Sequence, residues 1–423
     1  MAEEKRQEEQ EFSFVKEKIK RQRFYQNRVF RRVVLQIVLG AVCGAVACFT
    51  FVVLHPWMDE KFGEEEKKEI VFPSEDEEEK EPAEEPAEPA EPVVITEKQE
   101  LEIEDYRKLY GKLRAVALES EKCLVTVTAA SSDMDWFNET YESQKQLSGL
   151  LVGNNGVELL ILTVYSEVSS ANELQVMFAD KSVLNAVLKN HDVVTDLAVL
   201  SVNLADVQES TMESIRMAEL GSSKSLRAGE PVIAVGSPAG TAGSVIYGNL
   251  TAGGFSMSVI DGEYDLLITD MNRTGDGSGV LLNLDGQVIG LIEHRYLNPN
   301  NKNVLTAYSI SDMKDVIEHL SNSQDLVYIG VMGENVTEEI AQAVNLPKGV
   351  YITGVEMDSP AMNAGLQQGD VITVISGQEI ESVSQIQEML LKFSKEQEIQ
   401  VNVMRQGKEG YKEISCKVVL NCL

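Results

Sequence analysis

The chain has 423 residues, 43% of them apolar and 25% charged, which is ordinary for a protein that folds into two or three domains. Its formal net charge is -31 and its isoelectric point is about 4.5. Duplex affinity depends on basic groups that displace counterions from phosphates, so this charge excludes a nucleic-acid partner. The cysteines and histidines show no metal-ligand spacing, and we expect neither a metal nor a cofactor.

The N-terminal segment predicts a single membrane anchor. Residues 16–32 hold eight Lys or Arg against one acid, and residues 33–54 form an uncharged run of 22. In a helix this run spans roughly 33 Å, enough for a bilayer core of about 30 Å. The positive-inside rule then makes 1–32 a cytoplasmic tail and places everything beyond the anchor outside the cytoplasm. A cleaved signal peptide is the alternative, but the run is longer than such segments usually are.

An acidic segment rich in Glu and Pro follows the anchor, over residues 55–100. Between Asp59 and Pro92 it carries 16 acids against four bases. Such a stretch buries too little apolar surface to offset its ordering entropy, so we expect an extended spacer.

Most of the remaining chain predicts short strands separated by turn residues. A helical pattern at 102–120 comes first, and another at 311–320 closes the region. The strand-like runs lie at 123–129, 148–153, 158–165, 174–179, 197–202, 231–237, 244–252, 265–271, 280–292 and 304–310. This pattern indicates a β-barrel or sandwich domain, which we place at 101–322.

The last hundred residues have a different pattern and predict a small α+β domain at 323–423. Helical patterns at 337–345 and 383–394 alternate with strands. The strands are expected at 326–331, 349–355, 370–377 and 398–405. Cys123, Cys416 and Cys422 are expected to be mostly structural free thiols, although a disulfide between two of them is left open.

Several stretches, taken in order, carry a family resemblance. They are 158-ELLILT-163, 195-TDLAVL-200, 231-PVIAVGSPAGTAGSVIYGNLTA-252, 281-LLNLDGQVIGL-291, 307-AYSISDMKDVIEHL-320, 328-YIGV-331 and 349-GVYITGVEMDSPAMNAGLQQGDVITVISGQEI-380. Together they resemble the membrane-anchored HtrA/Deg serine proteases. The resemblance implies a mainly β fold, in which a chymotrypsin/trypsin-like double β-barrel is followed by a PDZ domain. It also implies a bacterial cell-membrane protein and a possible trimer.

The resemblance places a catalytic triad on residues that do not all suit the chemistry. Asp196 matches the triad aspartate, but the position of the family histidine, three residues after Thr163, holds Ser166. A serine hydroxyl has no accessible pKa near neutrality and does not act as a general base. His55, His191, His294 and His319 do not replace it by sequence position. The alternative is a displaced base, because folding can bring His191 or His294 closer to the site than their spacing shows.

The nucleophile loop is also altered. Alignment on the residues that follow it puts Gly277 at the family serine position and Ser278 at the glycine after it. A shift of one residue moves a hydroxyl by about 3.5 Å and turns it to the opposite side of an extended chain. A one-residue gap is the alternative, and it would make Ser278 the nucleophile. The N–H groups of Gly275 and Gly277 remain candidates for an oxyanion-hole-like nest, or they simply form a turn.

The PDZ-like region keeps the parts needed to bind a peptide. The stretch Tyr328, Ile329, Gly330, Val331 resembles a carboxylate-binding loop beside a strand edge that can accept a peptide. A groove closed by packing against the barrels is the alternative.

These observations favour a non-catalytic HtrA-like receptor that binds polypeptide segments or protein C-termini, in protein quality control or envelope stress. The second hypothesis is an active serine endopeptidase with a non-standard site that uses Asp196 and Ser278. The third is a structural subunit that joins active relatives in a hetero-oligomer.

Overall fold

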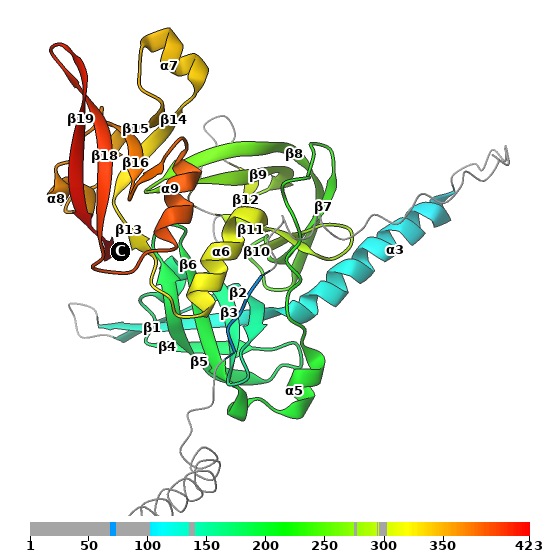
Figure 1. Cartoon of the computed structure of the whole chain (residues 1–423). Coiled ribbons are helices and arrows are strands. Elements are labelled where there is room, and N and C mark those ends of the chain that lie inside the picture. The colour runs from blue at the N-terminus through cyan, green and yellow to red at the C-terminus, as the bar shows by residue number, and fades with distance from the viewer. Residues whose placement is uncertain (1–67, 73–101, 135–139, 275–276, 294, 296–302) are drawn as a thin grey trace, which may run out of the picture. The chain divides into compact units, whose positions relative to one another are not determined.

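The computed structural model describes residues 68–72, 102–134, 140–274, 277–293, 295 and 303–423 (Figure 1). All of them belong to one compact unit, Lys67–Leu423. Within this described part, no helix is both long enough and apolar enough to cross a bilayer. The predicted anchor at 33–54 lies outside it, as do His55 and His294.

The first barrel is closed by six antiparallel strands in the order β1-β2-β3-β6-β5-β4. Helix α3 (Ile103–Ser120) and a short 3-10 turn, η2 (Glu121–Cys123), lead into it. The strands are β1 (Leu124–Met134), β2 (Thr140–Asn154), β3 (Glu158–Val164), β4 (Glu173–Met177), β5 (Val183–Asp192) and β6 (Leu197–Asn203). Helix α4 (Tyr165–Val168) follows β3, and η3 (Leu204–Asp206) and α5 (Glu209–Ser214) follow β6.

The second barrel has the order β10-β11-β12-β9-β8-β7 and is also closed. Its strands are β7 (Pro231–Ser237), β8 (Ser244–Val259), β9 (Gly262–Asn272), β10 (Ser278–Leu282), β11 (Val288–Glu293) and β12 (Val304–Ser309). Helix α6 (Ile310–Ser321) follows β12 and turns seven of its side chains into the protein. The predicted double β-barrel is therefore confirmed.

Burial explains why the strands read as continuous apolar runs instead of alternating patterns. All five central residues of β3 are buried, as are the last six of β7. One apolar cluster fills the first barrel and another fills the second. A third cluster joins the facing sides of both barrels to α6. Strands covered on both faces keep few positions for polar residues, so their sequences lose the period of two.

The C-terminal domain is the predicted PDZ domain. Its main sheet has the order β14-β15-β16-β18-β19, so β14 is an edge strand. The strands are β13 (Val327–Tyr328), β14 (Val331–Val336), β15 (Gly349–Val355), β16 (Val371–Ile375), β17 (Gln378–Glu379), β18 (Glu398–Gly407), β19 (Gly410–Val419) and β20 (Asn421–Cys422). The helices are α7 (Glu338–Val344), α8 (Pro360–Ala364) and α9 (Val383–Leu390). The domain has its own core, and Cys123, Cys416 and Cys422 are free thiols.

Part of the predicted spacer is bound to the barrels, which corrects the expectation for residues 68–72. The Ile70 N–H donates to Asn322 Oδ1 at 2.9 Å, and Asn322 Nδ2 donates back to the Ile70 carbonyl at 2.7 Å. The Phe72 N–H donates to Glu318 Oε2 at 3.0 Å. Both apolar side chains pack against the core between the barrels. The sequence prediction rested on the average charge of the segment and overlooked the short apolar run 70–72. Burial of apolar side chains opposes the entropy cost of ordering the chain.

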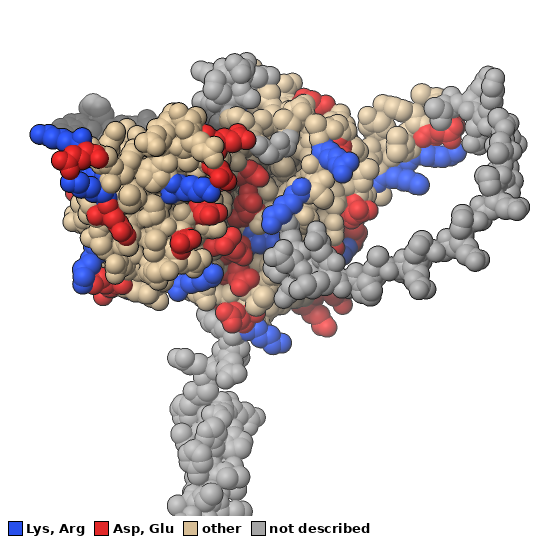
Figure 2. Space-filling view, turned by 45° about the horizontal axis from the view of Figure 1, so that its top comes forward, with Lys and Arg blue, Asp and Glu red and all other residues tan. Residues whose placement is uncertain are grey.

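Basic and acidic side chains are mixed on the surface that Figure 2 shows. On the face in Figure 2, Lys and Arg side chains are scattered among Asp and Glu and form no continuous basic patch.

Candidate functional site

Ser166 and Asp196 meet because β3 and β6 are paired. Their register sets Val164 opposite Leu197, which brings the start of α4 beside the turn before β6. The Ser166 N–H donates to Asp196 Oδ1 at 2.7 Å, and its hydroxyl donates to Oδ2 at 2.8 Å. A triad histidine would meet the same carboxylate through a ring N–H. Asp196 therefore bonds a serine hydroxyl and a backbone N–H, where the aspartate of a catalytic triad bonds an imidazole.

The turn that carries Asp196 is held rigidly. Asp196 adopts a left-handed φ of 62°, which aspartate tolerates better than most residues. Asp192 Oδ2 accepts from the N–H and the hydroxyl of Thr195, at 2.9 and 2.6 Å. The guanidinium of Arg295, from the second barrel, donates to the carbonyls of Val193 and Val194. The first barrel thus keeps the aspartate in a fixed position, with Ser166 as its partner.

The two described histidines make other contacts. The His191 ring stacks on Tyr165 with centroids 4.1 Å apart. His319 Nδ1 lies 2.8 Å from the Asp315 carbonyl, and its Nε2 lies 3.1 Å from the Leu391 carbonyl. Neither ring is hydrogen-bonded to Asp196 or Ser278 in the described part of the chain.

Ser278 begins β10 and is buried, with 2% of its surface exposed. It pairs with Ser237 on β7, and its Oγ accepts a hydrogen bond from the Ser148 N–H of β2 at 2.8 Å. This bond connects the two barrels. The hydroxyl thus satisfies a backbone donor in the core, where a peptide carbonyl does not reach it in this arrangement.

Gly277, which the ungapped alignment puts at the family serine position, is also buried. A Cβ at this position would lie 2.5 Å from the Pro238 carbonyl oxygen, so a side chain there requires the loop to move. The Gly277 N–H donates to the Thr274 carbonyl at 3.0 Å. An oxyanion role for that N–H stays a prediction that requires this turn to open, and Gly275 lies outside the described residues.

The PDZ loop between β13 and β14 is occupied by a carboxylate from the second barrel. The N–H groups of Ile329 and Gly330 donate to Asp261 Oδ2 at 2.7 and 2.8 Å. The Val331 N–H donates to Oδ1 at 2.8 Å. Asp261 lies in the turn between β8 and β9, and 6% of its surface is exposed. The four loop residues predicted from sequence are therefore brought together, and three of them hold a carboxylate.

Burial raises the pKa of Asp261 to about 6, although the three loop N–H groups act in the opposite direction. Sequence reasoning missed this residue. The dipeptide Asp261-Gly262 does signal a tight hairpin turn, and Asp261 has the left-handed φ of 55° that such a turn needs. Nothing in the sequence indicates that the turn meets a loop about 70 residues away.

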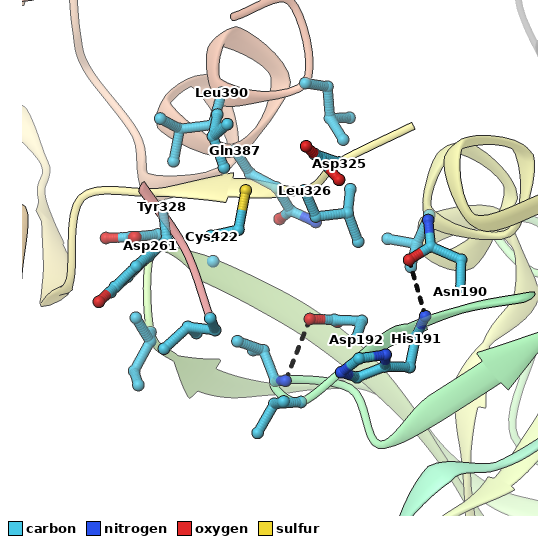
Figure 3. A pocket seen from close by; sticks show the side chains of 18 of the residues that line it. Asn190, His191, Asp192, Asp261, Asp325, Leu326, Tyr328, Gln387, Leu390 and Cys422 are labelled. Carbon is cyan, nitrogen blue, oxygen red and sulfur yellow. Dashed lines mark hydrogen bonds between the residues drawn. The ribbon is translucent and has the colours of Figure 1, made fainter. Parts of the chain in front are cut away.

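A cavity of about 170 Å³ lies beside this contact (Figure 3). The second barrel contributes Asp261 and Tyr264, and the end of β5 contributes His191 and Asp192. Its PDZ wall includes Leu326, Tyr328, Gln387, Leu390 and Cys422. The cavity therefore combines apolar side chains with carboxylates, and it opens next to the carboxylate-binding loop.

Comparisons with known protein families and with individual proteins agree with one another. A trypsin-like peptidase domain matches residues 147–291, and a PDZ domain matches residues 327–416. The chain is 32% identical over 274 residues to the "Probable periplasmic serine endoprotease DegP-like" of Hahella chejuensis. It is 31% identical over 289 residues to "Serine protease Do-like HtrA" of Bacillus subtilis. Together these matches support an HtrA-like family for the chain.

The extent of these similarities differs between sequence and structure. The first relative is matched over 63% of this HtrA-like chain and 56% of its own length, and the second over 63% and 62%. The chain thus spans somewhat more than half the length of these relatives. A solved structure, "HtrA-type protease AlgW with decapeptide", aligns with a TM-score of 0.54 at 21% identity. It covers 74% of this chain and 98% of that one, and it shows the same fold.

Proposed function

We propose that this HtrA-like protein is a non-catalytic receptor for polypeptide C-termini. It is anchored in the cell membrane by residues 33–54, with both folded domains outside the cytoplasm, and acts in protein quality control or envelope stress. The observation that carries the proposal is the pairing of Ser166 with Asp196, at the position where a protease of this fold needs a base.

The condition of the second catalytic position supports the same conclusion. Ser278 is buried and its oxygen already accepts the Ser148 N–H. Removing either the serine or the histidine of such a triad costs about as much as removing all of it, on the order of 10⁶ in kcat. An intact aspartate therefore does not preserve activity.

Peptide binding is supported by the chemistry of the PDZ loop. Three N–H groups converge on one carboxylate, so the loop has the geometry to hold the terminal carboxylate of a peptide. Strand β14 lies at the edge of its sheet and can receive the peptide as an added strand. The structural neighbour AlgW was solved with a decapeptide. Trimers, or mixed oligomers with active relatives, belong to the same proposal.

Two assays on the full-length chain test the absence of catalysis. We expect no labelling by a fluorophosphonate probe above the level of Ser278→Ala, and no cleavage of casein. The Bacillus subtilis relative serves as the positive control. Labelling that maps to Ser278 and disappears in the alanine variant would show an active endopeptidase instead.

Fluorescence anisotropy tests the receptor. We expect fluorescein-labelled decapeptides ending in Val, Leu or Phe to bind as free acids and not as C-terminal amides. An apolar last residue suits Leu326 and Leu390 beside the loop. Equal binding of acids and amides would exclude the loop as the recognition site.

A further inference from the structure

The turn between β8 and β9 contacts the PDZ domain in the way that a bound peptide would. Besides the side-chain carboxylate in the loop, the backbone N–H of Asp261 donates to the Val331 carbonyl at 2.8 Å. Val331 is the first residue of β14, whose other edge pairs with β15. A peptide that extends a PDZ sheet uses the same two elements, a carboxylate in the loop and a backbone bond to the edge strand.

The residues after Asp261 continue this arrangement between β14 and α9. A side chain at Gly262 would begin 3.2 Å from Gln387 Oε1 on α9. Asn335 of β14 donates to Glu263 Oε2 at 3.4 Å and accepts the N–H of Val383, the first residue of α9, at 2.7 Å. Strand β9 also contacts α9, and β8 contacts β14. The turn therefore occupies the space between strand and helix that an added peptide strand needs.

The carboxylate of Asp261 is hydrogen-bonded by backbone N–H groups of the loop. No Lys or Arg forms an ion pair with it among the described residues, and its stabilising partners are the N–H groups of Ile329, Gly330 and Val331. The α-carboxylate of a peptide offers the same two oxygens to these donors. A site that holds one carboxylate cannot hold the other at the same time.

We infer that the β8–β9 turn, residues 259–263, is a built-in ligand of the PDZ loop, and that a polypeptide with a free C-terminal carboxylate binds by displacing Asp261. This inference rests on the proposed function and adds its regulation. An attached ligand competes at a high effective concentration. The apparent affinity for a free peptide is therefore the intrinsic affinity multiplied by the fraction of molecules in which the turn has left the loop. The protein is then selective for ligands that bind strongly or are presented at high local concentration.

Asp261→Asn tests this inference in the full-length chain. Whichever way the asparagine amide is oriented, its NH₂ group faces at least one N–H of the loop and cannot accept a hydrogen bond from it. The contact between residue 261 and the loop is therefore weakened. Asp265→Asn is the matched control, because Asp265 lies on the same hairpin and bonds Ser256 Oγ at 2.7 Å. Two readouts are taken: anisotropy with the labelled decapeptide acids and amides, and hydrogen exchange of the amides at 329–331.

We expect Asp261→Asn to bind the acids about tenfold more tightly, or more, than the unmodified chain and the control. The amides at 329–331 should exchange faster in the unliganded Asn variant alone. Unchanged exchange, or unchanged affinity with the preference for acids retained, would overturn the inference and leave the proposed function in place. Faster exchange without binding of any decapeptide would overturn the proposed function and the competition with it.

Discussion

The protease-type site and the PDZ loop are built from different parts of the chain. In the barrels, function depends on which side chains stand at 166 and 277, and a serine and a glycine stand there. In the PDZ domain, a carboxylate is held by the backbone N–H groups of Ile329, Gly330 and Val331. A single substitution removes a general base, whereas a backbone nest persists as long as the loop keeps its conformation. A fold that loses one function by substitution can thus retain the other.

The largest expected effect comes from breaking the loop itself. Gly330 has a φ of +90°, and a Cβ there would lie 2.3 Å from Ser359 Cβ. We expect Gly330→Ala to abolish the preference for peptide acids and to lower the free energy of unfolding by about 1–3 kcal/mol, measured by anisotropy and urea denaturation. The matched control is Gly365→Ala, at φ +83° with nothing within 4 Å of the added Cβ. Retained acid preference in Gly330→Ala would contradict a backbone-built site.

A smaller effect is expected at Ser278. Ser278→Ala leaves the Ser148 N–H without its acceptor in a buried position, so the free energy of unfolding should fall by about 1–3 kcal/mol. Urea denaturation measures the change. Ser169→Ala removes an exposed hydroxyl and should have little effect. If the two variants are equally stable, Ser278 does not have the structural role described above.

At Ser166 the effect should be smaller again. Ser166→Ala removes one of two donors to Asp196 and leaves the backbone N–H in place. Because the site is exposed to water, we expect a loss of roughly 0.5–1.5 kcal/mol in unfolding free energy. Comparison with Ser278→Ala by the same denaturation assay ranks the two positions. A larger loss at Ser166 would reverse the order that burial predicts.

The smallest effect is a pH dependence of peptide affinity. Burial raises the pKa of Asp261 to about 6, so closing the turn onto the loop takes up a proton near that pH. Proton uptake by Asp261 therefore stabilises the closed state, in which the turn occupies the loop. This stabilisation is fully present below the pKa of free aspartate, about 3.9, and is lost as pH rises through 6. Affinity for peptide acids should therefore increase severalfold from pH 5 to pH 7.

The neighbours that interact electrostatically with Asp261 should not obscure this change. Burial raises the pKa values of Tyr264 and Tyr328 above their ordinary values, so both remain neutral in this window. Anisotropy across the range measures the dependence, and Asp261→Asn should reduce it. The same slope in that variant would assign the titration to another group.

The sequence by itself determined the architecture of the folded domains. Apolar runs such as 158–164 and 231–237 became the buried strands they predicted, because burial on both faces selects apolar residues locally. Ser166 and the loop 328–331 were found by position within ordered motifs, and the structure places them beside Asp196 and at the head of β14.

Only the tertiary structure decided which partners these residues have. Asp261 reaches a loop about 70 residues later in the chain, Ser148 reaches Ser278 over 130 residues, and Ile70 reaches Asn322 over 252. Each is a hydrogen bond formed on burial between segments that have no local reason to meet. Their energies depend on geometry and on exclusion of water, which a linear pattern does not record. The occupied state of the PDZ loop therefore follows from the packing of the second barrel against it.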